Sequence, residues 1–257
     1  MITRAEIKFI RSLADKRTRD EEGLFVAEGE KLVGEIAASQ LRIRRIFALN
    51  GVLGGVDGAE RVSSAEMERL SLLKTSSSCI AVVEKPRHTL APEQLRKGLT
   101  LALDDVQNPG NMGTIIRLAD WFGIADVVCS PACADCFAPK VVQATMGAIL
   151  RVRVHYTPLP GFLAAMRRAG EPVYGTLLEG GRDIYGAELA PHGVIVMGNE
   201  GRGLSAAVAE TLTERLFIPP YPSDRCGSES LNVAVATAVV CAEFRRRESL
   251  YYIPPVF

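Results

Sequence analysis

The feature that most constrains the fold is an apolar run that ends in a glycine-rich turn. Residues 194–197 read Val-Ile-Val-Met, and residues 198–205 read Gly-Asn-Glu-Gly-Arg-Gly-Leu-Ser. The run predicts a buried strand, and Ser205 offers a start for a helix after the turn. Open α/β sheets bind ligands at the carboxyl ends of their strands. We therefore expect this turn, with Glu200 at its tip, to form part of a binding site.

The second half of the chain alternates such apolar runs with segments of helical periodicity. Strands written as unbroken apolar runs are buried on both faces, which predicts a mainly parallel sheet covered by helices. The expected strands are residues 99–103, 127–129, 151–154, 173–178, 194–197 and 216–218. The expected helices are residues 115–122, 141–148, 163–169, a segment after Ser205, and about 230–247.

The first 95 residues predict a smaller α/β module. We expect helices over residues 7–14, 30–38 and 63–73, and strands over residues 24–27, 43–49 and 79–83. Ser63 and Glu66 form a capping box that begins the third helix. Residues 86–97 contain prolines and charges without periodicity, which is typical of a linker. We place the domain boundary near residue 95, giving domains of residues 1–95 and 96–257.

Composition limits the environment of the protein. Of the 257 residues, 47% are hydrophobic, and the formal net charge is zero. No run approaches the roughly 18 apolar residues of a membrane helix, and the N-terminus lacks the apolar segment of a signal peptide. We therefore expect a cytoplasmic protein that does not associate with membranes.

The six cysteines are expected to be ordinary reduced thiols, because a chain of this length without a secretion signal does not use a disulfide framework. Cys129, Cys133 and Cys136 lie close together in the sequence. Tetrahedral zinc would need a fourth ligand, and the chain has no second CxxC and no paired histidines. We expect no metal site.

Charge is distributed unevenly along the chain. Residues 1–97 contain 17 Lys and Arg against 14 Asp and Glu, a net charge of +3, and the remainder carries −3. A basic first half is typical of an RNA-facing module attached to a catalytic domain, although solvated surface charge without a function explains the asymmetry equally well.

Two further stretches could meet the 198–205 turn. Residues 108–113 read Asn-Pro-Gly-Asn-Met-Gly, and such residues can adopt positive φ and leave amides free for an anion or nucleotide. Arg117 follows one helical turn later; its planar guanidinium suits phosphate, unless it is only a solvated surface residue. Ser230-Leu231-Asn232 either joins the site or merely starts a helix. We interpret the three stretches as one site.

Together these stretches resemble the SpoU branch of the SPOUT RNA methyltransferases. The matching residues are Asn108-x-Gly-Asn111-x-Gly113-x-x-x-Arg117-x-Ala119, Met197-Gly198-Asn199-Glu200-Gly201-x-Gly203, Ile218-Pro219, and Ser230-Leu231-Asn232-Val233-x-Val235-Ala236. Pro139-Lys140-Val141-Val142 and Met146-Gly147-Ala148 are also similar to the family. Near the front, Lys16-Arg17-x-Arg19 and residues 23–33 resemble the substrate-binding module of many members.

The resemblance implies a ribosomal-protein-like α/β substrate-binding domain, followed by a trefoil-knotted SPOUT domain built on a mainly parallel sheet. It also implies a homodimer with sites near the subunit interface, and S-adenosylmethionine as the cofactor. The residues implied to line the cofactor pocket are Thr176, Met197, Gly198, Asn199, Gly201, Ile218 and Leu231. The connection over residues 219–229 looks longer than is usual in the family, so we expect a differently shaped cofactor loop.

The implied reaction is methyl transfer to a ribose 2′-hydroxyl of ribosomal or transfer RNA. The implied reaction centre consists of Asn111, Arg117, Glu200, Ser230 and Asn232. A guanidinium stays protonated in proteins, so our hypothesis is that Arg117 grips a phosphate and stabilises the developing alkoxide, rather than acting as a base. The asparagines would orient it, Glu200 would fix its position, and Ser230 would contact the RNA backbone.

Target choice would belong to the first domain. The candidates for phosphate contacts there are Lys8, Arg11, Lys16, Arg17, Arg19 and Lys31. Two alternatives remain open on the sequence alone: a non-catalytic RNA-binding protein that keeps the fold, and a different α/β enzyme such as a nucleotide-binding oxidoreductase or a phosphotransferase. The second alternative lacks both standard phosphate-loop patterns.

Overall fold

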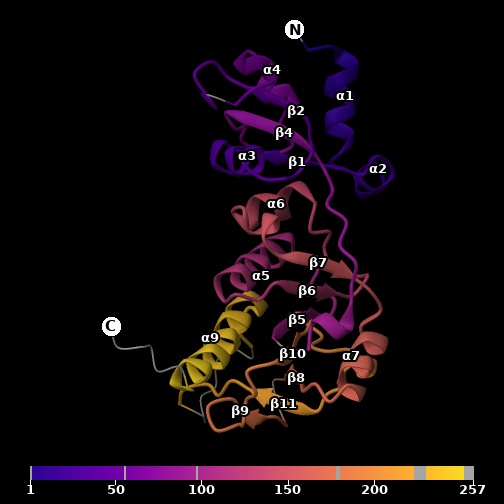
Figure 1. Ribbon diagram of the computed structural model, residues 1–257, viewed down its shortest axis with the longest axis vertical. Coiled ribbons are helices and arrows are strands. Elements are labelled where there is room, and N and C mark those ends of the chain that lie inside the picture. Colours follow the sequence, from indigo (N-terminus) through magenta and orange to yellow (C-terminus); the bar gives the residue numbers. More distant parts are fainter. Residues whose placement is uncertain (1, 55, 97, 178–179, 223–229, 252–257) are drawn as a thin grey trace. The chain divides into compact units, whose positions relative to one another are not determined.

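The computed structural model describes residues 2–54, 56–96, 98–177, 180–222 and 230–251 (Figure 1). The chain divides into two compact units. The first comprises residues 1–87 and 135–150, and the second comprises residues 88–134 and 151–257. Most of the 219–229 connection, residues 223–229, lies outside the described residues.

The first unit is built on a four-stranded sheet in the order β1-β4-β2-β3. β4 pairs antiparallel with both β1 and β2, whereas β2 pairs parallel with β3. The strands are β1 Leu24–Glu28, β2 Ile43–Ala48, β3 Ala59–Arg61 and β4 Cys79–Glu84. The helices are α1 Arg4–Ser12, α2 Lys16–Glu22, α3 Glu30–Ala37, α4 Ser64–Leu70 and α6 Pro139–Thr145, with a 3-10 turn η2 over Ala148–Leu150.

Alternation along the strands gives this sheet two apolar faces. Leu24 and Val26 of β1 join a core with residues of α1 and α4, such as Ile10 and Met67. The intervening residues of β1 join a second core with Val33 and other residues of α3 and with residues of the 135–150 segment. Because successive strand side chains point to opposite faces, one sheet supports two cores.

The helices of this unit differ in part from the sequence prediction: α1 begins and ends earlier than residues 7–14, and the last turn of the predicted 63–73 helix is absent. The Ser63–Glu66 capping box begins α4 as predicted, but α4 ends at Leu70 rather than Leu73. The physical reason is Ser71, which leaves the helical conformation and donates its hydroxyl to the buried Glu28 carboxylate at 2.6 Å. α2 is a separate helix that the periodicity did not predict, and Asp15 caps its N-terminus.

The second unit contains a seven-stranded sheet in which every pair is parallel, as the apolar runs predicted. Its order is β7-β6-β5-β10-β8-β11-β9. The strands are β5 Leu99–Leu103, β6 Asp126–Cys129, β7 Arg153–Tyr156, β8 Val173–Thr176, β9 Arg182–Asp183, β10 Gly193–Met197 and β11 Glu214–Phe217. The helices are α5 Pro109–Trp121, α7 Leu159–Arg168, α8 Ala206–Ala209 and α9 Val233–Tyr251, with a 3-10 turn η1 over Pro92–Gln94.

Helices cover both faces of this sheet. α7 and α8 pack on one face, where Val194 and Val196 of β10 meet Leu163 and Val208. α5 and α9 lie beside one another elsewhere in the unit (Figure 1) and are joined by Arg245 Nε, which donates to the Phe122 carbonyl at 2.8 Å. No described helix is long and apolar enough to cross a membrane.

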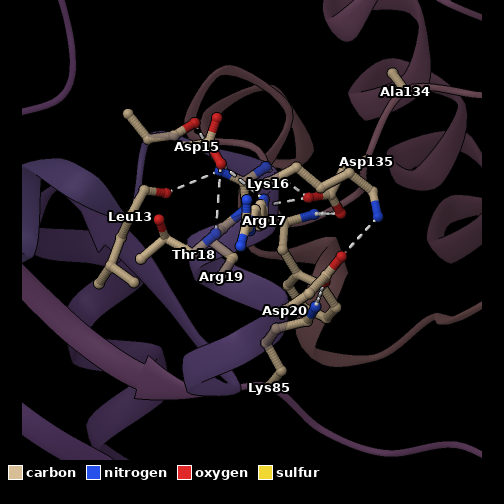
Figure 2. Close-up of polar contacts among 12 residues, drawn as sticks. Leu13, Asp15, Lys16, Arg17, Thr18, Arg19, Asp20, Lys85, Ala134 and Asp135 are labelled. Atoms are coloured by element: carbon tan, nitrogen blue, oxygen red, sulfur yellow. Dashed lines mark hydrogen bonds and ion pairs between the residues drawn. The ribbon is translucent and has the colours of Figure 1, made fainter.

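Residues 135–150 pack in the first unit although they lie between β6 and β7 in the chain. The Phe137 ring packs on Phe25 of β1 with centroids 5.0 Å apart, and Val142 is part of the core on the α3 face. Asp135 forms an ion pair with Arg19 of α2 at 2.6 Å (Figure 2). The segment is therefore held by apolar packing and by a buried charge pair.

Candidate active site

The carboxyl ends of four neighbouring strands meet at one edge of the parallel sheet. β5 ends at Leu103, β10 at Met197, β8 at Thr176 and β11 at Phe217, and these strands are consecutive in the sheet order. Parallel strands present their carboxyl ends to the same edge, and this is the edge where open α/β sheets bind ligands. The 198–205 loop and the N-terminus of α5 both leave from this edge.

The 198–205 loop is a closed turn. The amide and carbonyl of Asn199 exchange two hydrogen bonds with Gly203, at 3.0 and 2.9 Å. The Asn199 side-chain oxygen accepts from the amides of Gly201 and Arg202 at 2.9 and 3.1 Å. A Cβ on Gly198 would lie 2.5 Å from the Gly203 carbonyl carbon, so only glycine fits where the two sides of the turn meet.

The 108–113 stretch forms the start of α5 rather than an open amide cradle. The Asn108 side-chain oxygen accepts from the amides of Gly110 and Asn111 at 2.8 and 3.1 Å. The expectation that this turn leaves these amides free and uses positive φ is wrong, because an N-cap residue satisfies them and both glycines are helical.

Side-chain hydrogen bonds join one residue from each of the three sequence stretches. Asn111 donates its amide to the Glu200 carboxylate. Asn232 in turn donates its amide to the Asn111 side-chain oxygen at 3.1 Å. A helix start, a strand-end loop and a second helix start therefore converge at one edge of the sheet.

Asn232 has two roles in the structure. Its side-chain oxygen accepts from the amides of Ala234 and Val235 at 3.0 and 3.3 Å, so it caps α9. Its side-chain nitrogen reaches Asn111. Asn232 therefore both starts a helix and belongs to the site, so the two interpretations of the 230–232 stretch are compatible. Ser230 is exposed two residues earlier and has no hydrogen-bond partner among the described residues.

Arg117 is not joined to this network. It is an exposed residue in the middle of α5, and its guanidinium has no hydrogen-bond or ion-pair partner in the part of the chain that the structure describes. Arg117 and Trp121 are four residues apart and share a face of the helix. Trp121 is 83% exposed. The structure thus presents this arginine with its donors available to a ligand.

Several residues predicted to line the cofactor pocket lie at or directly after the ends of three adjacent strands, β10, β8 and β11. Thr176 ends β8 and donates its hydroxyl to the Val196 carbonyl at 3.3 Å, while Met197 ends β10 and is buried. Ile218 directly follows β11 and is half-buried. Leu231, next to Asn232, is 48% exposed. Strand-end backbone groups beside apolar side chains are the donor set that a nucleoside cofactor requires, so these residues fit S-adenosylmethionine.

Arg19 does not lie where an RNA phosphate could reach it. Its side chain is 2% exposed, and Nε and Nη2 both donate to Asp135 Oδ2, at 3.0 and 2.6 Å (Figure 2). Nη1 donates to the carbonyls of Leu13 and Ala14 at 2.8 Å each. The prediction that Arg19 contacts phosphate is therefore wrong, because burial and four hydrogen bonds already satisfy the guanidinium.

The other basic candidates of the first unit are exposed. Lys16 pairs with Asp20 and Arg17 with Glu21, both at 2.7 Å and one helical turn apart. Arg11 donates to the carbonyls at the end of α4, at 3.1 and 3.2 Å. Lys8 and Lys31 are exposed. All five side chains are exposed, three of them with partners of their own, and their contact with RNA phosphates stays a prediction.

Sequence reasoning missed Asp104, Asp105 and Arg202 at the edge of the sheet. The Asp104 carboxylate accepts from the Ser205 amide at 2.8 Å. Asp105 has a left-handed backbone with φ 60° and forms an ion pair with Arg202. The position of Asp104 and Asp105 directly after a buried strand could have marked them as candidates. The pairing of Asp105 with Arg202 could be found only from the fold.

The cysteines near this edge are structural. Cys129 and Cys133 are buried, and the Cys133 thiol donates to the Leu103 carbonyl at 3.1 Å. Hydrogen bonds from Cys129 first, and then from Ser130 and nearby amides, lower the pKa of the Cys133 thiol to about 7. Within the described ranges, no group of three or more His, Cys, Asp or Glu could hold a metal ion.

Two family models and a relative of known name match the chain, and the first model spans all three stretches of the site. Residues 98–242 match the model of the SpoU rRNA Methylase family, and residues 4–91 match the MRM3-like substrate binding domain. The 23S rRNA (guanosine(2553)-2′-O)-methyltransferase RlmP of Bacillus subtilis is 31% identical over 245 residues, which covers 93% of this chain and 96% of the relative.

Solved structures show the same architecture over nearly the whole chain. A TrmH-family protein from Porphyromonas gingivalis is 42% identical with a TM-score of 0.86, covering 96% of this chain and 99% of that one. An AdoMet-bound rRNA methyltransferase from Sinorhizobium meliloti is 28% identical with a TM-score of 0.82, covering 96% of each chain. The predicted resemblance is confirmed: the chain belongs to the SpoU rRNA methylase family.

Proposed function

We propose that this protein transfers a methyl group to a ribose 2′-hydroxyl of ribosomal or transfer RNA. The observation that carries the proposal is the hydrogen-bonded set Asn111–Glu200–Asn232, which joins the three family motifs at the ligand-binding edge of the sheet. Its relatives from Bacillus subtilis and Ralstonia nicotianae are named as 23S rRNA 2′-O-methyltransferases, which favours ribosomal RNA.

S-adenosylmethionine is the cofactor that we assign to the strand-end residues. Thr176, Met197, Gly198, Ile218 and Leu231 would hold it, together with Asn199 and Gly201 of the turn. When bound, it supplies an electrophilic methyl group on a sulfonium. Gly198 and Gly203 keep the turn compact, because a side chain at position 198 would collide with the Gly203 backbone.

Arg117 supplies the positive charge of the reaction centre. A guanidinium stays protonated in proteins, so Arg117 does not remove the proton of the 2′-hydroxyl. It instead binds the adjacent phosphate through its planar fork and stabilises negative charge that develops on the ribose oxygen. The absence of a partner for Arg117 among the described residues supports this role, because its donors are not used by the fold.

The asparagine and glutamate side chains fix the position of the attacking group. Glu200 is anchored by Asn111, and Asn111 is anchored by Asn232, so each side chain restricts the rotamers of the next. Ser230 lies exposed beside this set and would contact the RNA backbone. The 2′-hydroxyl is a weak nucleophile. Holding it in line with the methyl group lowers the entropic part of the activation barrier.

We infer that residues 1–95 select the RNA and that residues 96–257 carry out the reaction in the cytoplasm. Lys8, Arg11, Lys16, Arg17 and Lys31 are exposed on the first domain and would contact phosphates. Such contacts position the RNA but do not depend on its sequence. Target specificity would therefore come from contacts with bases that are unstacked from the RNA helix.

We also infer that the protein is a homodimer. Trp121, one helical turn after Arg117 on α5, is 83% exposed, and Val235 on the adjacent α9 is 51% exposed. Large apolar side chains that stay exposed on two adjacent helices are candidates for burial between subunits, if they form one contiguous surface. A Trp121→Asp variant should shift the mass measured by sedimentation from dimer to monomer; an unchanged dimer would place the interface elsewhere.

The trefoil knot is a further part of the proposal. Support comes from the sheet order, which inserts β10 between β5 and β8, and from Asn232, which returns to the start of α5 after β11. An experimental map that traces residues 198–205 and 218–232 continuously would show whether the chain passes through its own loop.

The experiment that tests the function is transfer of labelled methyl from S-adenosylmethionine to unmodified ribosomal and transfer RNA. After alkaline hydrolysis, label in an alkali-resistant dinucleotide would establish 2′-O-methylation, because a methylated 2′-oxygen cannot attack the neighbouring phosphate. Label on mononucleotides would mean base methylation and would overturn the site assignment. Failure to bind the cofactor at all would favour a non-catalytic RNA-binding protein.

A further inference from the structure

Asp105 has a backbone conformation that aspartate seldom adopts. It follows β5 directly and has φ 60°, the left-handed region in which residues other than glycine are uncommon and in which Asn and Asp are the better tolerated exceptions. All three of its polar groups are used. Its amide donates to Ser130 Oγ at 2.9 Å, its carbonyl accepts from Asn199 Nδ2 at 2.9 Å, and its carboxylate pairs with Arg202.

The turn that contains Asp105 is held from the β6 side. The Val106 amide donates to the buried Cys133 thiol at 3.3 Å, and the Ala134 amide donates to the Val106 carbonyl at 2.9 Å. A sparsely populated conformation persists when the surroundings over-determine it. These bonds, together with the bond to Ser130, fix the left-handed residue independently of its carboxylate.

The 198–205 loop is attached to this turn at three points. Asn199 reaches the Asp105 carbonyl, Arg202 reaches the Asp105 carboxylate, and the Ser205 amide reaches the Asp104 carboxylate at 2.8 Å. The loop's internal bonds make it one body, as described above. Its position relative to the sheet edge is therefore set in part by these attachments and by the bond between Glu200 and Asn111, beside the packing of Leu204 against the core.

We propose that Asp105 is a positioning residue for the methyl transfer, and that its carboxylate, through Arg202, sets the placement of the 198–205 loop and hence of Glu200. The inference rests on the proposed function, because it assigns a role within that site. Asp105 touches the loop rather than the reacting atoms, so it acts through Arg202 and Asn199. It is distinct from the reaction-centre residues, and none of the sequence stretches includes it.

Because Asp105 has a left-handed backbone, its carboxylate can be removed by a glycine substitution without straining the backbone. Asp105→Gly removes the carboxylate and keeps a residue that adopts φ 60° without strain. Asp105→Asn keeps the left-handed preference and one acceptor oxygen but removes the charge. Arg202→Met removes the partner at a position that is largely exposed, so it should not unfold the protein. Asp120→Asn is the matched control, because it breaks another partly exposed pair, with Arg151, away from the loop.

The first measurement is hydrogen exchange of the full-length protein without RNA or cofactor, so it does not depend on the proposed activity. We expect faster exchange over residues 199–205 in Asp105→Gly and Arg202→Met, with no change in β5 or β10, and wild-type exchange in Asp120→Asn. The two substitutions should be non-additive, since they remove the same pair. Wild-type exchange in both variants, or faster exchange throughout the sheet, would overturn the proposal.

The second measurement is steady-state methylation of unmodified 23S rRNA with varied S-adenosylmethionine. A displaced reacting geometry can cost about a hundredfold per ångström, and a partial displacement should lower kcat/KM by about tenfold in Asp105→Gly. Asp105→Asn should recover most of that loss. A normal kcat/KM in a variant whose loop exchanges faster would overturn the positioning role, whereas an inactive wild type would count against the proposed function alone.

Discussion

Two arginines show how differently the two units of this protein use the same side chain. Arg19 in the first unit is 2% exposed and makes four hydrogen bonds, two to the Asp135 carboxylate and two to backbone carbonyls. Arg117 in the second unit is exposed on α5, and no described residue pairs with it. The sequence predicted that both arginines contact RNA phosphates.

The difference teaches that positive charge alone does not indicate a binding residue. A buried guanidinium is retained by the fold because every partner is supplied internally, and removing it leaves a buried carboxylate unpaired. An exposed guanidinium whose N–H groups have no partner in the fold contributes little to folding. Those N–H groups can instead donate hydrogen bonds to a ligand. The comparison predicts opposite outcomes for stability and activity.

The largest effect should come from breaking the buried pair. Arg19→Met should lower the free energy of unfolding by about 3–5 kcal/mol, because the Asp135 carboxylate stays buried without a counter-charge. Urea denaturation measures this. Arg17→Met is the control: it breaks an exposed pair in the same helix and should cost under about 0.5 kcal/mol. Equal losses for the two variants would contradict the distinction.

A large effect of the opposite kind is expected at Arg117. Arg117→Met should lower kcat/KM by about 10²–10³-fold, the scale of removing one preorganised charge donor, while the free energy of unfolding stays within about 0.5 kcal/mol of wild type. Arg117→Lys keeps the charge but loses the planar fork. Near-normal turnover in Arg117→Lys would remove the case for bidentate phosphate binding.

The side chains that surround the reaction centre should show a smaller, shared effect. Asn111→Ala and Glu200→Ala should each reduce kcat/KM by about tenfold or more, and the double variant should be little worse than either, because the residues are bonded to one another. Glu200→Gln keeps an acceptor for Asn111 and should recover part of the loss. Additive losses in the double variant would show that the two act separately.

Exposed basic residues of the first domain should affect binding only. Replacing Lys16 and Arg17 together with Gln should weaken RNA binding uniformly across sequences and reduce the slope of log affinity against log salt by about 2. Filter binding at several salt concentrations measures the slope. The same loss on one RNA sequence only would indicate base contacts instead of phosphate contacts.

The smallest effect concerns pH. Hydrogen bonds from Lys16 first, and then from Lys85, lower the pKa of the Asp20 carboxyl from 3.8 to about 2 (Figure 2). A lowered pKa means that the stabilisation is fully present above pH 3.8 and is lost as the pH falls through 2. An NMR titration of Asp20 should show this low midpoint, and Lys16→Gln should raise it; an unchanged midpoint would mean that Lys85 alone sets it.

The sequence predicted the parallel sheet and the meeting of Asn111, Glu200 and Asn232, because apolar runs and strand-end turns carry local information. It failed where a partner lies far along the chain. Asp135 is 116 residues from Arg19, and Arg202 is 97 residues from Asp105, so neither ion pair leaves a local pattern. Short strands such as β3 and β9 also escaped prediction, since three or two residues show no periodicity.

The placement of residues 135–150 has a consequence for how such proteins can be recombined. The chain passes between the units at three points, at residues 87–88, 134–135 and 150–151. A gene fusion that exchanged only residues 1–95 would strip Phe137 and Val142 of their apolar neighbours and leave Asp135 without its arginine. A working chimera must therefore import residues 135–150 together with the new front domain.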